Sequence, residues 1–171
     1  MDSRLPGMEH HQAILRTILD FYAEDNRIDA ILVFGSLGRG NWDAYSDLDL
    51  DIVTTDDPLD VPAEFEQLCA FIQREHGLEA IIIADAEEGD VVLSNLVEFS
   101  IRYHPLKTTK PAILDTMKLL AGHLSLDQIR AAGEANRRSS ENDLSEQVNQ
   151  CVRYCLEVQT AIKRGRVWMA L

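Results

Sequence analysis

The sequence contains no apolar run of about 18 residues, the length that a membrane-spanning helix needs. Its first residues, MDSRLPGMEHHQ, lack the basic-then-apolar pattern of a secretion signal. It has only three cysteines, and an odd number argues against a disulfide framework. We therefore expect a cytoplasmic protein without a membrane partner.

Positive charge is scarce. The chain has 16 Lys and Arg against 29 Asp and Glu, which gives a formal net charge of −13 at pH 7. Such a surface repels a phosphate backbone, so long nucleic acid is a poor partner. A small anion can still bind where metal ions intervene, and a cationic small molecule would be attracted.

No internal repeat or low-complexity tract interrupts the 171 residues, a length that fits one compact domain or a domain with a small appendage. Hydrophobic residues make up 46%, which is enough for a core. Periodicity and turn residues divide the chain into segments. We expect helices over 8–24, 62–76, 125–136 and 144–164, strands over 28–34, 48–54, 79–86 and 96–103, a turn at 87–90 and a linker at 136–143.

The predicted fold class is α+β, because strands and helices are mixed in the first part of the chain and the last part looks helical throughout. A small mixed sheet with backing helices occupies residues 1–106, and a helical C-terminal segment, which need not be complete, occupies residues 107–171. Within that segment, Ser125 and Gln128 fit a capping box at a helix start.

Three aspartates, Asp47, Asp49 and Asp51, alternate with apolar residues at the start of the strand predicted over 48–54. Residues two apart share a face of a strand, so Asp47 and Asp49 project together with Cα atoms roughly 6–7 Å apart. Two such carboxylates suit a pair of divalent ions in phosphoryl transfer, and Mg²⁺ completes its shell with substrate phosphates. The pattern predicts a Mg²⁺ site at Asp47 and Asp49. Asp51, further along, is expected to be solvated or salt-bridged.

A glycine–serine pair follows the buried strand at 28–34. Glycine at position 35 lets the backbone approach a ligand closely. The hydroxyl of Ser36 and the amides of residues 37–39 would form an anion site at the start of a short helix. Arg39 could add a charge-assisted contact to a phosphate, or it could be an ordinary surface arginine.

The complete pattern, an apolar strand, Gly35-Ser36, a spacer and SDLDL, resembles the signature of the DNA polymerase β-like nucleotidyltransferase superfamily. The resemblance covers roughly residues 28–103. It implies that Gly35 and Ser36 bind the triphosphate of a nucleotide and that Asp47 and Asp49 hold Mg²⁺.

The superfamily also has a third carboxylate on a later strand. Glu98, in Val97-Glu98-Phe99, is similar in position and setting, with glutamate in place of the more common aspartate. The resemblance implies that Glu98 binds a metal ion or acts as the general base. One of the acidic residues in the predicted turn could take this part instead. These are Glu87, Glu88 and Asp90.

A short catalytic domain with a helical tail resembles antibiotic nucleotidyltransferases that act on aminoglycosides or lincosamides, and also minimal nucleotidyltransferases paired with helical toxin partners. We expect Mg²⁺-dependent transfer of a nucleoside monophosphate from an NTP, such as ATP, to a hydroxyl of a small acceptor, with release of pyrophosphate. The alternatives are a protein-modifying antitoxin and a binding module without activity. Intact Asp47 and Asp49 argue against the last.

Other polar and aromatic residues have simpler interpretations. Cys151 and Cys155 lie on the apolar stripe of a predicted helix, so core packing is favoured over metal binding. The pair His10 and His11 is expected to be exposed to solvent. Trp42 would shield the site, stack on a base or pack a turn.

The last residues, RVWMAL, begin a new apolar stripe with Val167, Trp168 and Leu171. Exposed apolar surface usually marks an interface. The tail therefore suggests a homodimer contact or a helical domain that continues further, or else an end that folds back on its own core.

Overall fold

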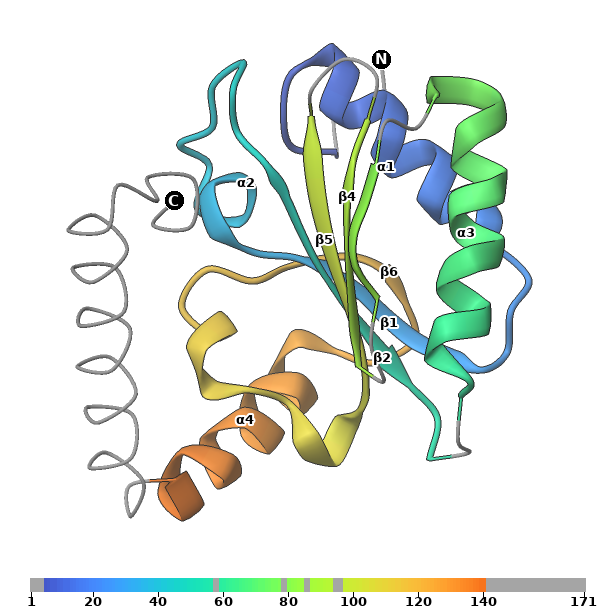
Figure 1. Cartoon of the computed structure of the whole chain (residues 1–171). Coiled ribbons are helices and arrows are strands. Elements are labelled where there is room, and N and C mark those ends of the chain that lie inside the picture. Colours follow the sequence, from blue (N-terminus) through green and yellow to red (C-terminus); the bar gives the residue numbers. More distant parts are fainter. Residues whose placement is uncertain (1–4, 57–58, 78–79, 85–86, 94–96, 141–171) are drawn as a thin grey trace, which may run out of the picture. The chain divides into compact units, whose positions relative to one another are not determined.

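A computed structural model describes residues 5–56, 59–77, 80–84, 87–93 and 97–140, with the backbone alone for 80–84 and 138–140 (Figure 1). It contains the helices and strands of a mixed α/β protein. The helices are α1 (Glu9–Phe21), α2 (Gly35–Arg39), α3 (Val61–His76) and α4 (Leu126–Ser140), and the strands are β1 (Ile28–Val33), β2 (Leu48–Thr54), β3 (Ala80–Ala84), β4 (Glu88–Val92), β5 (Glu98–Pro105) and β6 (Lys118–Gly122). Short 3-10 turns occupy Leu106–Thr108 and Pro111–Ile113.

The strands form one sheet in the order β3-β4-β5-β2-β1-β6. β2 and β5 are parallel, and the other neighbouring strands are antiparallel. The sheet is therefore mixed, as the sequence predicts.

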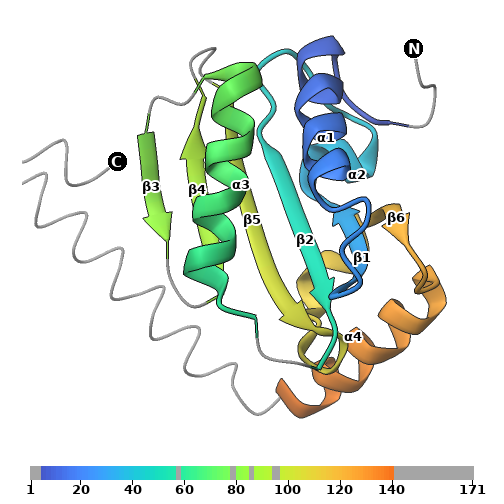
Figure 2. The same cartoon turned by 90° about the vertical axis from the view of Figure 1, so that its right-hand side faces the viewer.

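Helices α1 and α3 cover one face of the sheet (Figure 2). The alternation of β2 explains this packing, because Leu48, Leu50 and Ile52 all point toward these helices and are buried. Ile14 and Phe65 supply the helical side of the same core. Burial of this apolar layer is the main stabilising term of the domain.

A second, smaller core lies on the opposite face. It joins Leu32 of β1 and Val53 of β2 to Ile113, Met117 and Ile129. Asp49 shares the face of Val53 by alternation, but the second core does not include it. We call this side, which carries Asp49, Ser100 and Asp90, the acidic face of the sheet.

Two expectations on secondary structure are wrong. Three residues of the turn expected at 87–90 belong instead to strand β4 (Glu88–Val92), because this strand pairs with both β3 and β5. Residues 118–122 form strand β6 rather than part of a helical segment, because they satisfy the backbone groups along the free edge of β1. Both strands are short, and so few residues carry too little periodic pattern to predict their secondary structure.

The start of α4 confirms the predicted capping box. The Ser125 amide donates to Oε1 of Gln128 at 2.9 Å, and the Gln128 amide donates to the Ser125 hydroxyl at 3.3 Å. The helix continues to Ser140, so the part of the expected linker at 136–140 is helical.

Contacts divide the chain into two compact units, Met1–Asn136 and Arg137–Leu171. The first extends beyond the boundary at residue 106 that the sequence suggests. The predicted helix over 144–164, with Cys151 and Cys155, and the tail with Val167, Trp168 and Leu171 lie outside the described residues. Within the described residues, no helix has the length and apolar character needed to cross a membrane.

Candidate active site

The acidic face brings together side chains from three neighbouring strands. Asp49 of β2 lies opposite Ser100 of β5, and Ser100 lies opposite Asp90 of β4. Paired residues of adjacent strands point to the same face. The three side chains therefore form one row across the sheet.

Asp49 lies in a field of negative charge. Burial raises the pKa of its carboxyl group, and the nearby charges of Asp47, Glu98 and Asp90 raise the pKa further. The positive charge of Arg39 opposes them. The structure thus brings the predicted carboxylates Asp47 and Glu98 within electrostatic reach of Asp49, and it adds Asp90.

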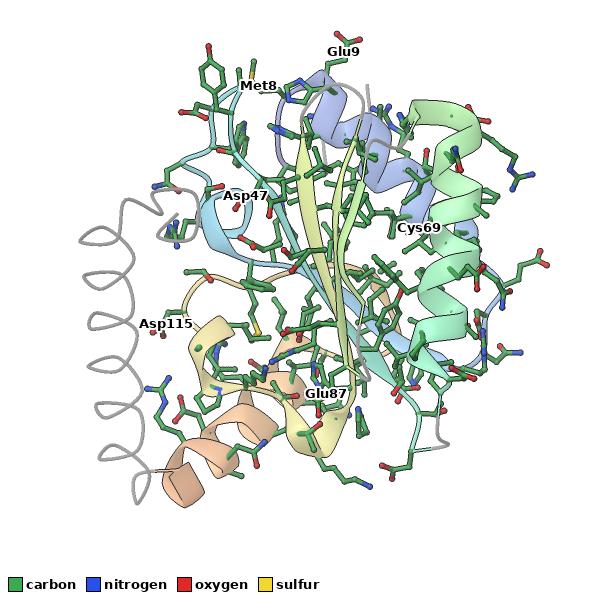
Figure 3. All side chains as sticks on the ribbon, in the orientation of Figure 1. Met8, Glu9, Asp47, Cys69, Glu87 and Asp115 are labelled. Atoms are coloured by element: carbon green, nitrogen blue, oxygen red, sulfur yellow. The ribbon has the colours of Figure 1, made fainter. Side chains whose placement is uncertain are left out.

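Asp47 and Glu98 occupy equivalent places at the starts of two parallel strands. The first β2–β5 pair joins Leu48 to Phe99, and each acid directly precedes its member of that pair. Both acids are exposed. Figure 3 shows Asp47 beside α2, on the side of the sheet away from α3.

The first residue of α2 fits closely against Asp49. Gly35 has a φ of +61°, which favours glycine, and a Cβ there would collide with Oδ2 of Asp49. The adjacent Ser36 hydroxyl oxygen is buried, and no hydrogen-bond partner is found for it among the described residues. A buried hydroxyl without a partner is costly, so it marks a position where a ligand oxygen would be stabilising.

The other groups of the predicted anion site, the Gly38 amide and the Arg39 side chain, already take part in hydrogen bonds within the protein. The amide of Gly38 donates to the Phe34 carbonyl at 3.0 Å, so it is used within the turn and is not free for a phosphate, contrary to the expectation. Arg39 is exposed, and its Nε donates to Oδ1 of Asn41 at 3.4 Å. Its charge acts on Asp49, which places it near the row of acids.

Asp51 confirms the salt-bridge expectation. Its carboxylate is fully buried and accepts hydrogen bonds from Arg102 at 2.8 and 2.5 Å and from His104 at 2.7 Å. Both partners lie on the neighbouring strand β5. This carboxylate therefore has Arg102 as a counter-ion within the protein and is not available to a ligand.

The carboxylates suit Mg²⁺, which prefers oxygen ligands. Among the described residues, no three His, Cys, Asp or Glu side chains are already grouped closely enough to hold an ion. Asp47, Asp49 and Glu98, the three carboxylates expected to bind the metal, are therefore not grouped that closely in this structure. Burial raises the pKa of Asp49 most, followed by the charge of Asp47, and a bound cation would act against both by stabilising the ionised carboxylate.

Sequence reasoning placed two residues wrongly. Asp90 is expected in a turn but lies on strand β4, and the run EGDVV has no alternation of polar and apolar residues that would indicate a strand. His11 was expected to be exposed with His10, but it is fully buried in the first turn of α1. No local pattern would have revealed its partner, the carbonyl of Ser46, which is distant in sequence. Trp42, for its part, packs against the larger core, which fits the turn-packing interpretation.

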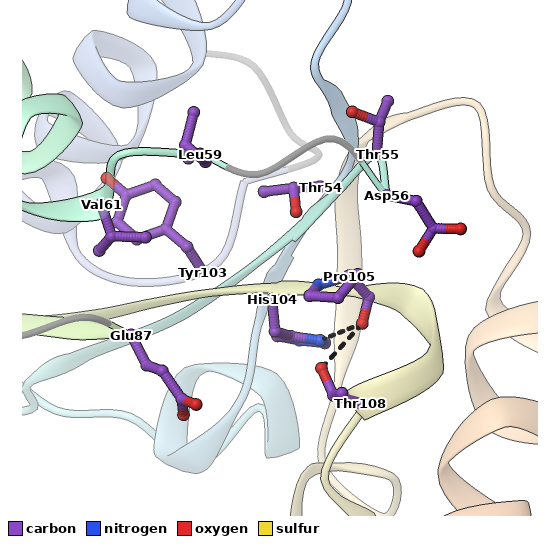
Figure 4. Close-up of a pocket in the computed structure, with 10 residues that line it drawn as sticks. All are labelled: Thr54, Thr55, Asp56, Leu59, Val61, Glu87, Tyr103, His104, Pro105 and Thr108. Carbon is purple, nitrogen blue, oxygen red and sulfur yellow. Dashed lines mark hydrogen bonds between the residues drawn. The ribbon is translucent and has the colours of Figure 1, made fainter.

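A separate cavity of about 250 Å³ lies at the other end of β2 (Figure 4). Thr54, Tyr103 and His104 line it, and the His104 ring and the Thr108 hydroxyl both bond the Pro105 carbonyl, at 3.0 and 3.1 Å. None of Asp47, Asp49 and Glu98 lines this cavity. It is therefore distinct from the row of acids.

Residues 15–107 match the family described as Nucleotidyltransferase domain. Among curated proteins, no match to this chain is found. Among solved structures, a crystal structure of a toxin–antitoxin with AMP-PNP is similar with a TM-score of 0.51 at 14% identity, over 80% of this chain and 97% of that one. At this identity the likeness shows the fold.

Two structures of Cid1 are also similar, one described as an RNA terminal uridylyl transferase and one as a poly(U) polymerase with Mg and 3′-dATP bound. Both have a TM-score of 0.46, with identities of 19% and 18%. The matched region covers 63% of this chain but only 33% of each Cid1 chain.

Proposed function

Because the chain belongs to the nucleotidyltransferase domain family and is thus an enzyme of nucleotidyl transfer, we propose that it moves a nucleoside monophosphate from an NTP to a hydroxyl group with the help of Mg²⁺. The observation that carries this proposal is the set of charges around Asp49. Asp47, Glu98 and Asp90 all act on this carboxylate, and Gly35 packs directly against it.

The residues then have the following roles. The acceptor oxygen attacks the α-phosphorus, and the bond to the bridging oxygen of the leaving pyrophosphate breaks. The Ser36 hydroxyl donates a hydrogen bond to a phosphate oxygen, and Arg39 supplies a nearby positive charge. Asp47 and Asp49 would hold the metal ion, which when bound would neutralise the charge that develops at the α-phosphate. Glu98 takes the proton of the acceptor hydroxyl or shares in metal binding.

The first candidate acceptor is a small, hydroxyl-bearing molecule such as an aminoglycoside or lincosamide antibiotic. The acidic face supports an acceptor that carries positive charge, because Asp90 of β4 extends the negative field beyond β5. Transfer to such a molecule would make the protein an antibiotic-resistance enzyme.

A second candidate acceptor is a hydroxyl group on a partner protein. Its support is the likeness in fold and length to a chain of the toxin–antitoxin structure with AMP-PNP, which is covered over 97% of its length. In this case the enzyme would modify a toxin and act as its antitoxin.

Pyrophosphate release from each of the four NTPs with Mg²⁺ tests the proposal. The reaction is run with aminoglycosides, lincosamides and a candidate toxin protein, and the labelled product is identified by mass. We expect one acceptor class to give product, and Asp49→Asn to give none. The proposal is wrong if the folded protein binds NTP but releases no pyrophosphate with any acceptor.

A further inference from the structure

A buried histidine connects the N-terminal helix to the segment that carries Asp47. The Nδ1 atom of His11 accepts a hydrogen bond from the Met8 amide at 3.0 Å, and its Nε2 donates to the Ser46 carbonyl at 2.8 Å. One acceptor and one donor nitrogen require the neutral ring with its proton on Nε2. Burial, followed by the neighbouring His10, lowers the pKa of His11, which favours this neutral form.

The turn before α1 fixes the His11 ring from the other side. Gly7 has a φ of +97°, and a Cβ there would lie 2.6 Å from the His11 Cβ. The Gln12 side chain holds this turn by donating to the carbonyls of Gly7 at 2.9 Å and Leu5 at 3.2 Å. This turn therefore orients the His11 ring independently of the bond to Ser46.

The loop that leads to Asp47 has its own short-range bonds. The Tyr45 amide donates to Oδ1 of Asp43 at 2.9 Å, and the Asp43 amide donates to the Ser46 hydroxyl at 3.0 Å. These bonds define the shape of the loop but not its position on the domain. The bond from His11, 35 residues away in sequence, ties the loop to α1.

The Ser46 carbonyl belongs to the peptide unit that enters Asp47. Because the first β2–β5 pair starts at Leu48, the strand pairing itself does not fix the Asp47 backbone. Asp47 is also exposed, so packing around its side chain adds little constraint. The position of the Asp47 carboxylate thus depends on the peptide that His11 holds.

We propose that His11 is a positioning residue, which holds Asp47 in its metal-binding position through the carbonyl of Ser46. This inference rests on the proposed function, in which Asp47 binds Mg²⁺. It extends the site to a side chain of α1 that touches neither metal nor substrate.

Two substitutions separate this role from simple packing. His11→Gln keeps an N–H donor near the place of Nε2, whereas His11→Asn keeps an acceptor near Nδ1 but is too short to reach Ser46. We measure Mn²⁺ binding by the folded protein and the Mg²⁺ dependence of turnover, together with thermal unfolding without metal. Loss of a residue that orients a metal ligand weakens metal affinity by about 10–100-fold. We expect that loss in His11→Asn and a largely restored affinity in His11→Gln.

His76→Gln is the matched control. His76 also bonds to α1, through Nε2 and the Thr17 hydroxyl at 2.8 Å, but it lies on α3, and this bond does not involve the loop that carries Asp47. It should leave the metal affinity unchanged. Parental Mn²⁺ affinity in a folded His11→Asn overturns the proposal. So does an equal loss in both His11 variants or a loss in His76→Gln, since each of these indicates a general structural effect.

Mn²⁺ binding also distinguishes a failure of the metal assignment at Asp47 from a failure of the positioning role of His11. If Asp47→Asn binds Mn²⁺ as the parent does, then the metal assignment of the proposed function fails, and the His11 proposal fails with it. If Asp47→Asn loses the ion and His11→Asn does not, then only the positioning role is wrong.

Discussion

Asp49 and Asp51 are two residues apart on the same strand and the same face, yet their surroundings are opposite. Asp51 is fully buried between Arg102 and His104, so the protein itself balances its charge. Asp49 is half-buried and mostly surrounded by acids, with Arg39 as the opposing charge. The difference shows that alternation only assigns a carboxylate to a face. The neighbouring strand decides whether that carboxylate is structural or is left for a ligand.

The largest expected effect is the loss of turnover in Asp49→Asn and in Asp47→Asn. Charge stabilisation by a catalytic metal amounts to several kcal/mol, so turnover should fall by about 10³-fold or more. Pyrophosphate release measures the effect, and Glu66→Gln, which changes an exposed acid of α3, is the control. If Asp49→Asn turns over as fast as the parent, the interpretation that Asp47 and Asp49 bind a pair of metal ions is wrong. Asp49 and Asp51 would then no longer differ in function.

Glu98→Gln should reduce transfer by roughly 10²–10⁴-fold if Glu98 is the general base, while NTP binding persists. Asp90→Asn is the informative comparison, because Asp90 lies in the row of Asp49 but on the far side of Ser100. We expect a smaller effect there. If instead Asp90→Asn is impaired and Glu98→Gln has parental rates, the third carboxylate belongs to β4.

Removal of the Asp51 carboxylate is expected to lower the stability of the fold. Asp51→Ala leaves the Arg102 guanidinium buried without its counter-ion, which typically costs about 3–5 kcal/mol of unfolding free energy. Denaturant unfolding measures it. The double variant Asp51→Leu with Arg102→Met should recover part of the loss, because no charge of the pair remains buried. An Asp51→Ala protein that is as stable as the parent but no longer binds Mg²⁺ would make Asp51 a ligand.

Much of the fold could be predicted from local patterns, and the partners of the aspartates could not. The bounds of β2 follow from its alternation, and the start of α4 follows from Ser125 and Gln128. The role of Asp51 depends on the parallel register that brings β5 beside β2, and sequence spacing does not encode that register. The same limit applies to β6, which becomes a strand only because β1 has an edge to pair.

The smallest expected effect concerns stability without metal. The pKa of Asp49 is raised in the folded state, so protonation of this carboxyl group favours folding. The stabilisation from protonation is complete below the ordinary pKa of 3.8. It is lost as the pH rises through the raised pKa. At neutral pH the ionised carboxylate therefore destabilises the metal-free fold. Asp49→Asn, which carries no charge there, should melt above the parent at neutral pH in EDTA, and the difference should vanish in acid. Thermal unfolding over a pH series measures this, and adding Mg²⁺ with NTP should stabilise the parent alone. A lower melting temperature for Asp49→Asn at neutral pH would mean that Asp49, like Asp51, has its counter-ion within the protein.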